Sequence, residues 1–358
     1  MTKRFLGEYP SFYPILALSR VAINTHVGLF ARMFHCPAVD MRVPTFPSPE
    51  LRRIAFLVAS SRFSCSYCTA HACSFGDMLR GSLTDRVRRG HTAPRVVLDA
   101  DDPSLSHAER VVVAFATAAV VRPLATAELR TLAERAADVT AAIGARGLEV
   151  IKAVVAFTGA LNTLTDVQGV VLEPDVQAFA SLHMPAPSSV GGTVAGEEEE
   201  GLWVPSPHHR NYDVKVGGVW GQTGPAKGTA AGTDEWDSSS NFRLGIRKRL
   251  ALFYVFARVT SCPALGDDAV TCMAHASGRL RSDIRAAWDA YYDVGDAGTA
   301  RADVSRRLVL AVGVKTENIS PELVTSLTNV LPPGAVVELA SLLSFLEMWR
   351  RLRVLSHV

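Results

Sequence analysis

Residues 51–71 of the chain read LRRIAFLVASSRFSCSYCTAH. The first part carries apolar residues at helical spacing, and the second part places Cys65, Cys68 and His71 three positions apart. Because an α-helix turns once in about 3.6 residues, these three side chains would share one face of a helix. The stretch therefore predicts two consecutive helices, the second of which presents a dithiol and an imidazole together.

This combination suits thiol redox chemistry. Ser64 can cap the second helix and so place both cysteines in its first turn, where the positive end of the helix would lower the pKa of each thiol. Cys68, activated by His71, could attack the distal oxygen of a peroxide. Cys65 could then condense with the resulting sulfenic acid, and an external dithiol could reduce the disulfide.

The composition is that of a globular chain with two domains. The chain has 358 residues, of which 48% are hydrophobic and 20% are charged, with a formal net charge of +2. Two domains of this size can each bury a core. No basic stretch is interleaved with aromatic residues as nucleic-acid binding would require. Residues 1–20 lack the features of a signal peptide, and no run of about 18 apolar residues predicts a membrane span. We expect a cytoplasmic protein that binds neither nucleic acid nor membrane.

The cysteine pattern favours catalysis over a disulfide framework or a metal site. Six cysteines in a chain of this length are too few for a disulfide scaffold. A structural zinc ion would need two ligands besides Cys65 and Cys68. Cys73 and His71 could supply them, but all four would crowd one short segment, and the chain has no second Cys-x-x-Cys pair. We therefore expect no metal and no cofactor. The remaining cysteines are Cys36, Cys262 and Cys272.

The N-terminal half shows helical signals throughout. A first helix is expected up to Pro37. Ser48-Pro49-Glu50 combines a cap residue, a proline and an acid in the order typical of a helix start. Residues 106–109 form a capping box before an apolar helix, and residues 147–169 predict a long apolar helix that ends near its final glycine. Strand signals are few, so the fold class is predicted to be all-α.

The chain divides into three segments. Residues 1–180 predict a helical bundle domain, and residues 242–358 return to a helical pattern. Between them, residues 181–241 are rich in Gly, Pro and Ser and predict a long irregular linker.

The second helical segment echoes the first. The sequence RLALF at 249–253 echoes RIAFL at 53–57, and CMAHA at 272–276 echoes CTAHA at 68–72. The long apolar helices near the two segment ends form a third echo. Three echoes in the same order indicate a duplicated helical domain.

The second copy lacks the dithiol. In the register of CMAHA, Ala269 matches Cys65, so that Cys272 and His275 alone remain. We expect these two residues to be remnants of the duplication, packed in a core.

The stretch CSYCTAHACSFG, with LRRIAFLVASS before it and AERVVVAFATA and the helix containing Asn162 after it, resembles the alkylhydroperoxidase AhpD-like, or carboxymuconolactone decarboxylase-like, superfamily. The resemblance covers residues 45–180 well and residues 245–358 faintly. It implies all-helical domains that associate through helix packing. Two fused copies would then form a pseudo-dimer, and whole chains could form a homo-oligomer. It also implies reduction of the dithiol by a thioredoxin-like or lipoylated protein.

The resemblance also implies roles for individual residues. Cys68 is then the thiol that reacts with a hydroperoxide, Cys65 its partner, and His71 part of a proton relay. Active members usually carry a relay glutamate about twelve positions before the first cysteine, where this chain has Arg53. Glu50, one turn earlier on the same face, is the candidate substitute, although it also suits the role of a first-turn acid. Arg53 could itself lower the pKa of a thiol by its charge.

Functions of different classes remain open. The first is a thiol-dependent peroxidase or disulfide reductase, an antioxidant enzyme in which the second domain is a structural copy. The second is a non-enzymatic redox sensor or scaffold, similar in outline to the sestrins, in which two such domains are fused. The third is a decarboxylase or isomerase acting on a cyclic acid. The intact dithiol argues against the third, because the decarboxylases of the superfamily lack it.

Overall fold

The computed structural model describes residues 47–63, 65–74, 99–120, 126–170, 172–174, 176–178, 246–294, 300–314, 319–331 and 333–358. Every regular element within these ranges is a helix, which confirms the all-α class for this part of the chain. The helix expected before Pro37, the cap residue Ser64, the linker at 181–241 and both domain boundaries lie outside the described residues.

The helices fall into two groups along the chain. The first group comprises α4 (Pro49–Arg62), α5 (Ser66–Ser74), α7 (His107–Ala119) and α8 (Thr126–Gln168). The second comprises α12 (Ile246–Val259), α13 (Pro263–Ser277), α14 (Arg281–Val294), α15 (Ala300–Val314), α16 (Pro321–Val330) and α17 (Pro333–Leu355).

Local signals in the sequence set the helix ends as predicted. Ser48 caps α4 by accepting a hydrogen bond from the amide of Leu51 at 3.4 Å. Ser106 and Glu109 form both bonds of a capping box at the start of α7, at 3.3 and 2.6 Å. The long helix α8 ends at Gln168, and the next residue, a glycine, has a φ of 57°. Each signal satisfies backbone groups that a helix end leaves without a partner, which explains why it acts locally.

Helix α8 contains a sharp break. Gly144 has φ 76° and ψ 162°, which separates the helix into two arms. Only glycine adopts a positive φ of this kind without strain. The second arm, residues 145–168, is the apolar helix expected from the sequence, and it carries the side chains that reach the candidate site.

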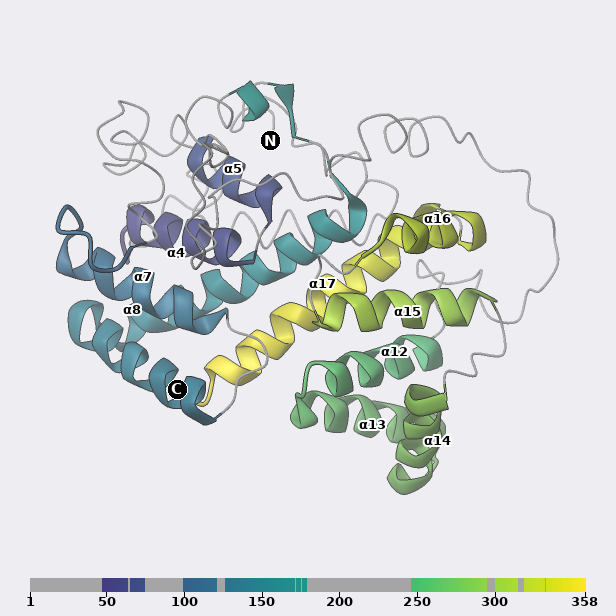
Figure 1. The fold of residues 1–358 in the computed structure, drawn as a ribbon. Coiled ribbons are helices and arrows are strands. Elements are labelled where there is room, and N and C mark those ends of the chain that lie inside the picture. The colour runs from purple at the N-terminus through teal and green to yellow at the C-terminus, as the bar shows by residue number, and fades with distance from the viewer. Residues whose placement is uncertain are drawn as a thin grey trace, which may run out of the picture.

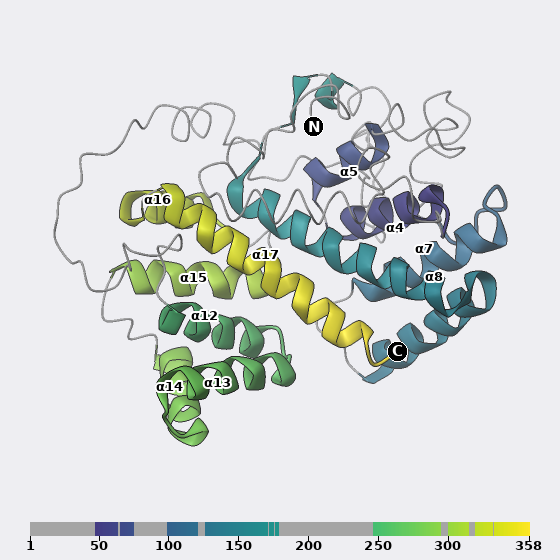
Figure 2. The same cartoon turned by 180° about the vertical axis from the view of Figure 1, so that it is seen from behind.

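Helix α17 lies between the first group of helices and the rest of the second group. Figures 1 and 2 show it from opposite sides, running diagonally with α4, α5, α7 and α8 on one side and α12 to α16 on the other. It packs most extensively on α8. One hydrophobic cluster contains core residues of both groups, among them Phe157 and Phe256. The two groups therefore share a core.

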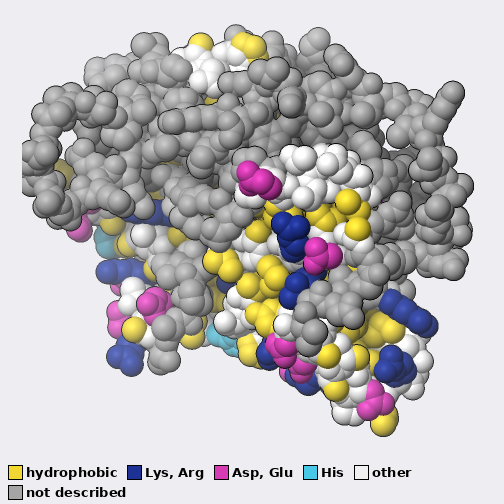
Figure 3. All heavy atoms as spheres, turned by 45° about the vertical axis from the view of Figure 1, so that its right-hand side comes forward, with side chains coloured by type: hydrophobic (Ala, Val, Ile, Leu, Met, Phe, Trp, Pro, Cys, Tyr) yellow, Lys and Arg dark blue, Asp and Glu magenta, His cyan; other side chains and the backbone are white. Residues whose placement is uncertain are grey.

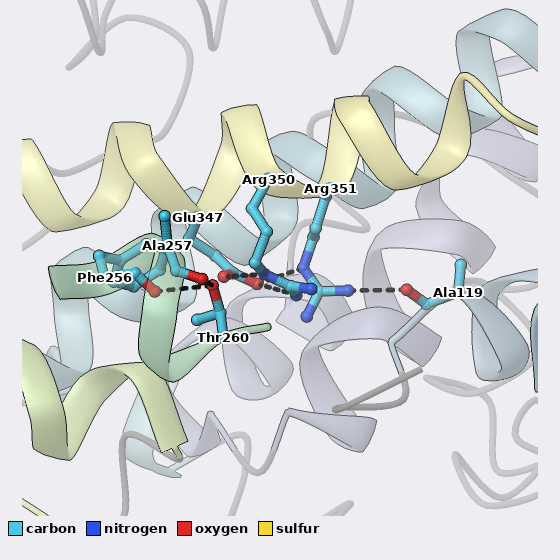
Figure 4. A network of polar contacts seen from close by, with 7 residues as sticks. All are labelled: Ala119, Phe256, Ala257, Thr260, Glu347, Arg350 and Arg351. Carbon is cyan, nitrogen blue, oxygen red and sulfur yellow. Dashed lines mark hydrogen bonds and ion pairs between the residues drawn. The ribbon is translucent and has the colours of Figure 1, made fainter. Parts of the chain in front are cut away.

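A buried ionic cluster lies at this contact (Figure 4). Glu347, whose side chain is fully buried, accepts hydrogen bonds from Arg350 at 2.9 and 3.0 Å and a further one from Arg351. Burial on its own would lower the pKa of Arg350, but the charge of Glu347, the hydrogen bonds to it and a smaller effect of Cys262 together offset this and hold that pKa above its usual value. The carboxylate thus neutralises two guanidinium groups that would otherwise be costly to bury.

Arg351 ties α17 to the first group of helices. It donates to the carbonyl of Ala119 at 2.8 Å, so a cation meets the negative end of α7. Its guanidinium lies 3.8 Å from the ring centroid of Phe63, the C-cap residue that follows α4. On α8 it faces Gly159, where an added Cβ would lie 2.7 Å from Arg351 Nε. A larger residue at that position would push the two helices apart or displace the guanidinium.

None of the helices in the described ranges combines the length and apolarity that crossing a bilayer requires.

Removing the charge of Glu347 should strongly destabilise the fold. We expect Glu347→Gln to lower the free energy of unfolding by about 3–5 kcal/mol, because it leaves two buried guanidinium groups without a counter-charge. Urea denaturation followed by circular dichroism measures this. The control is Asp138→Asn, which breaks an exposed pair with Arg135 and should cost less than about 1 kcal/mol. Equal losses in the two variants would contradict this account.

Candidate active site

The corner between α4 and α5 positions the first thiol. The amide of Cys65 donates to the carbonyl of Ser60 at 3.1 Å, and the carbonyl of Cys65 accepts from the amide of Thr69 at 3.0 Å. Cys65 therefore occupies the cap position before α5, and its sulfur accepts the amide hydrogen of Cys68 at 3.4 Å. Cys68 lies in the first turn as predicted, whereas Cys65 precedes the helix.

A single hydroxyl from α8 contacts both sulfurs. Thr165 Oγ1 lies 3.4 Å from Cys65 Sγ and 3.5 Å from Cys68 Sγ. Cys65 is fully buried, Cys68 is 3% exposed, and both are free thiols. The next polar contact along this seam joins Ser60 Oγ to Asn162 Oδ1 at 3.5 Å. The second arm of α8 thus provides the polar wall of the dithiol site.

His71 lies in a buried acid–base cluster with Glu173. Its Nε2 is 2.8 Å from Glu173 Oε2, and both side chains are less than 10% exposed. Tyr67 donates to the other oxygen of Glu173 at 2.9 Å. The rings of Tyr67 and His71 also make an edge-on contact, with centroids 4.3 Å apart. A carboxylate held in this way fixes the orientation of the imidazole and can share its proton.

Glu173 is a site residue that the sequence reasoning missed. It follows the end of α8 and begins a short helical turn, since its carbonyl accepts from the amide of Gln177 at 2.8 Å. In the sequence it stands only as an acid between a leucine and a proline in LEPD. Its separation of about a hundred positions from His71 means that packing of α8 against the α4–α5 corner, and no local pattern, brings the two together.

Glu50, the carboxylate predicted for the relay, forms an ion pair with Arg53. The distance between Glu50 Oε2 and Arg53 Nη1 is 3.6 Å, and both side chains are largely buried. Glu50 also follows Ser48 in the first turn of α4, which is its alternative role as a helix-start acid. The pairing reduces the effect that the charge of Arg53 could have on a nearby thiol.

The expected lowering of the Cys65 pKa is wrong. Burial raises the pKa of the Cys65 thiol well above its usual value, and the hydrogen bond with Cys68 and the charge of Asp166 raise it further. The hydrogen bond with Thr165 acts in the opposite direction. The cost of a charge in an apolar corner thus outweighs the favourable field at the helix start.

The corner between α12 and α13 repeats the backbone bonds of the corner between α4 and α5, with Cys262, and not Ala269, at the position of Cys65. The amide of Thr260 donates to the carbonyl of Phe256 and that of Cys262 to the carbonyl of Ala257, at 3.0 and 2.9 Å. These bonds repeat those at the end of α4, each 197 positions further along, as from Cys65 to Cys262. In this register Leu265 takes the place of Cys68. The second corner therefore has one buried thiol and no dithiol.

Cys272 and His275 are exposed on α13, so the expectation that they pack in a core is wrong. Ala269, one turn before Cys272, is fully buried instead. Helix α13 turns Leu265, Ala269, Val270 and Met273 inward and leaves these two side chains outside. Figure 3 shows the right-hand side of the molecule in Figure 1, where described charges of both signs lie among hydrophobic side chains.

Among the described side chains, no three His, Cys, Asp or Glu residues converge in a way that could hold a metal ion. The side chain of Cys73, the further zinc ligand considered, and the whole of Cys36 lie outside the described residues.

Comparisons of the chain with models of protein families, with curated proteins and with solved structures find no match.

The raised pKa of Cys65 predicts a pH-dependent stability. Above about pH 8.5 the unfolded thiol ionises while the folded thiol keeps its proton, so the folded state loses stability as the pH rises. The contribution approaches about 1.4 kcal/mol for each pH unit. Urea denaturation between pH 7.5 and about 9.5 measures it. We expect Cys65→Ala to fall less steeply than the unmodified chain and Cys272→Ala, an exposed control, to fall equally. Parallel curves for all three proteins would refute the assignment.

Proposed function

We propose that the chain is a thiol-dependent peroxidase that reduces organic hydroperoxides at Cys68 and Cys65. The observation that supports it best is the 2.8 Å contact between His71 and Glu173 beside the paired thiols. A dithiol, an imidazole and a carboxylate in one buried corner supply a nucleophile, a resolving group and a proton carrier. The relay carboxylate that the sequence pattern lacked at Arg53 is then Glu173, from a different part of the chain.

The reaction proceeds in balanced steps. The Cys68 thiol gives its proton to His71, and the thiolate attacks the distal oxygen of the hydroperoxide, which breaks the O–O bond. The products are a sulfenic acid on Cys68 and an alcohol, whose oxygen takes up the proton. The Cys65 thiol then attacks the sulfenic sulfur, which forms the disulfide and releases water. An external dithiol protein, thioredoxin-like or lipoylated, restores both thiols by exchange.

The environments of the two thiols fit these separate roles. Cys68 lies one helical turn before His71. Of the two thiols, it is the one that is slightly exposed, at 3%. Cys65 is fully buried, and its raised pKa favours the protonated thiol in the reduced site. A protonated partner thiol does not compete for the peroxide, since the thiolate is the reactive form.

We also propose that the chain is a tandem AhpD-like protein of the cytoplasm. The support is the sequence resemblance, the equal lengths of α4 and α12, and the repeated backbone bonds that relate Cys65 to Cys262. The two copies would then form a pseudo-dimer, and the contact between α8 and α17 would be its interface. The second copy would serve structure, because it lacks a dithiol.

A redox sensor is the second candidate. It is favoured by the burial of Cys65, because a thiol held protonated condenses slowly with a sulfenic acid and would let the oxidised state persist. The two functions differ in turnover. A peroxidase consumes many equivalents of hydroperoxide when a dithiol reductant is supplied, whereas a sensor stops after one.

Thiol titration tests the peroxidase chemistry. We expect the reduced protein to lose two free thiols on reaction with cumene hydroperoxide, because one sulfenic acid is resolved by one thiol. Cys68→Ser should lose none at this site. Cys65→Ser should instead accumulate a sulfenic acid that dimedone traps. Cys272→Ser is the matched control and should lose two thiols in the site like the unmodified protein. If the hydroperoxide leaves Cys65 and Cys68 reduced, the proposal is wrong.

A second experiment identifies the relay carboxylate. Glu173→Gln keeps the shape of the side chain but removes its charge, so we expect the rate of thiol oxidation by hydroperoxide to fall about 100-fold, the scale of general acid–base catalysis. Glu50→Gln is the competing variant and should have a much smaller effect. Stopped-flow measurement of the oxidation rate compares them. A larger loss for Glu50→Gln would assign the relay to the residue predicted from the sequence.

A further inference from the structure

We propose that Thr165 is a catalytic residue of the dithiol site, whose hydroxyl donates a hydrogen bond to whichever of the two sulfurs carries the negative charge. This inference rests on the proposed function and adds a group to the same site. The geometry behind it is the position of Thr165 Oγ1 between the sulfurs, 3.4 Å from Cys65 and 3.5 Å from Cys68.

In the reduced site, the proton of the Thr165 hydroxyl is held only by backbone carbonyls that already have a partner, so it can be redirected to a sulfur. A hydroxyl has one proton to donate and two lone pairs to accept with. In the reduced site, Thr165 donates along its own helix to the carbonyl of Leu161 at 3.0 Å or of Asn162 at 3.2 Å. The sulfurs, which are then thiols, can donate to the same oxygen. Bonds of this kind from a helical threonine to the preceding turn are common, and those carbonyls also take part in the helix backbone ladder.

Ionisation of a thiol changes the preferred direction of the Thr165 proton. A thiolate is a stronger acceptor than a carbonyl that already has a backbone partner, and hydrogen bonds to charged groups are roughly twice as strong as neutral ones. Rotation about the Cβ–Oγ bond of Thr165 then aims its proton at the sulfur. No backbone movement is required, since both sulfurs already lie at contact distance.

The near-equal distances allow one hydroxyl to serve both steps. When Cys68 attacks the hydroperoxide, the charge is on Cys68 and Thr165 donates there. In the second step Cys65 gives its proton to the sulfenic hydroxyl group, which leaves as water, and Thr165 donates instead to the sulfur of Cys65 as negative charge develops on it. The hydrogen bond between Thr165 and Cys65 already opposes the rise that burial causes in the pKa of Cys65. Because both thiols are almost completely buried, water is a poor substitute for this donor.

The pH profile of thiol alkylation tests this role without relying on peroxide chemistry. Proteins that keep one of the two site thiols, through Cys65→Ser or Cys68→Ser, are alkylated with iodoacetamide between pH 6 and about 11. Fragmentation of the peptide 63–80 by mass spectrometry separates modification of the remaining site thiol from modification of Cys73. In each background we expect Thr165→Val to move the midpoint upward by about one pH unit, the change expected from losing one hydrogen bond to a charged group. Thr165→Ser keeps the hydroxyl and should restore the original midpoint.

Thr158→Val is the matched control. Thr158 is fully buried on the same helix arm and donates to the carbonyl of Val154 at 2.7 Å in the same manner. Its variant should leave the midpoint unchanged. Thr165→Ala also removes the hydroxyl but leaves a smaller side chain than Thr165→Val. Both variants are measured, so that poor folding of one of them does not decide the result. A midpoint in Thr165→Val and Thr165→Ala equal to that of the parent would overturn the inference. An upward shift in a protein that consumes no hydroperoxide would support the inference and reject the peroxidase function.

Discussion

A buried guanidinium connects the two groups of helices to the corner that carries the thiols. Arg351 is bound by Glu347 on its own helix, meets the last carbonyl of α7 at Ala119 and packs on the ring of Phe63. Gly159 gives it room on α8. The Arg351 side chain is 1% exposed, and a buried charge of this kind is stable only when it is paired and hydrogen-bonded. Glu347, Ala119 and Phe63 must therefore be in place together. The cluster therefore fixes how α17 lies on α8, and with it the position of the second arm of α8.

The position of α8 determines the chemistry of the dithiol corner. Its second arm brings Thr165 to both sulfurs and Asn162 to Ser60, and the chain that follows its end carries Glu173 to His71. Helix α5 carries Cys68 and His71, but on its own it would leave the sulfurs without the hydroxyl of Thr165 and the imidazole without a carboxylate. The corner and α8 are thus complementary halves of one site. Their separation in the sequence means that the site exists only in the folded chain.

The sequence predicted the features that local hydrogen bonding decides. The start of α4 at Ser48, the capping box of α7 and the end of α8 before Gly169 all depend on residues within one turn of each other. Cys68 and His71 likewise lie on α5, whereas Cys65 occupies the cap position before it. Glu173 and Thr165 could not be found in this way, because about a hundred residues separate them from the thiols and only packing relates them. The pKa of Cys65 was misjudged because burial, which dominates it, has no local signature. Matching residue identities placed Ala269 opposite Cys65, whereas the backbone bonds at the helix ends select Cys262.

The central claim is that Cys65 and Cys68 form a disulfide when the protein reduces a hydroperoxide. Peptide mapping after a single equivalent of cumene hydroperoxide tests it most directly. Cleavage at arginine releases residues 63–80, which contain Cys65, Cys68 and Cys73. The account predicts that, after alkylation without reductant, this peptide is lighter by two hydrogen atoms, carries one alkyl group on Cys73, and takes up two more after reduction. A peptide alkylated on all three cysteines after hydroperoxide treatment would contradict it.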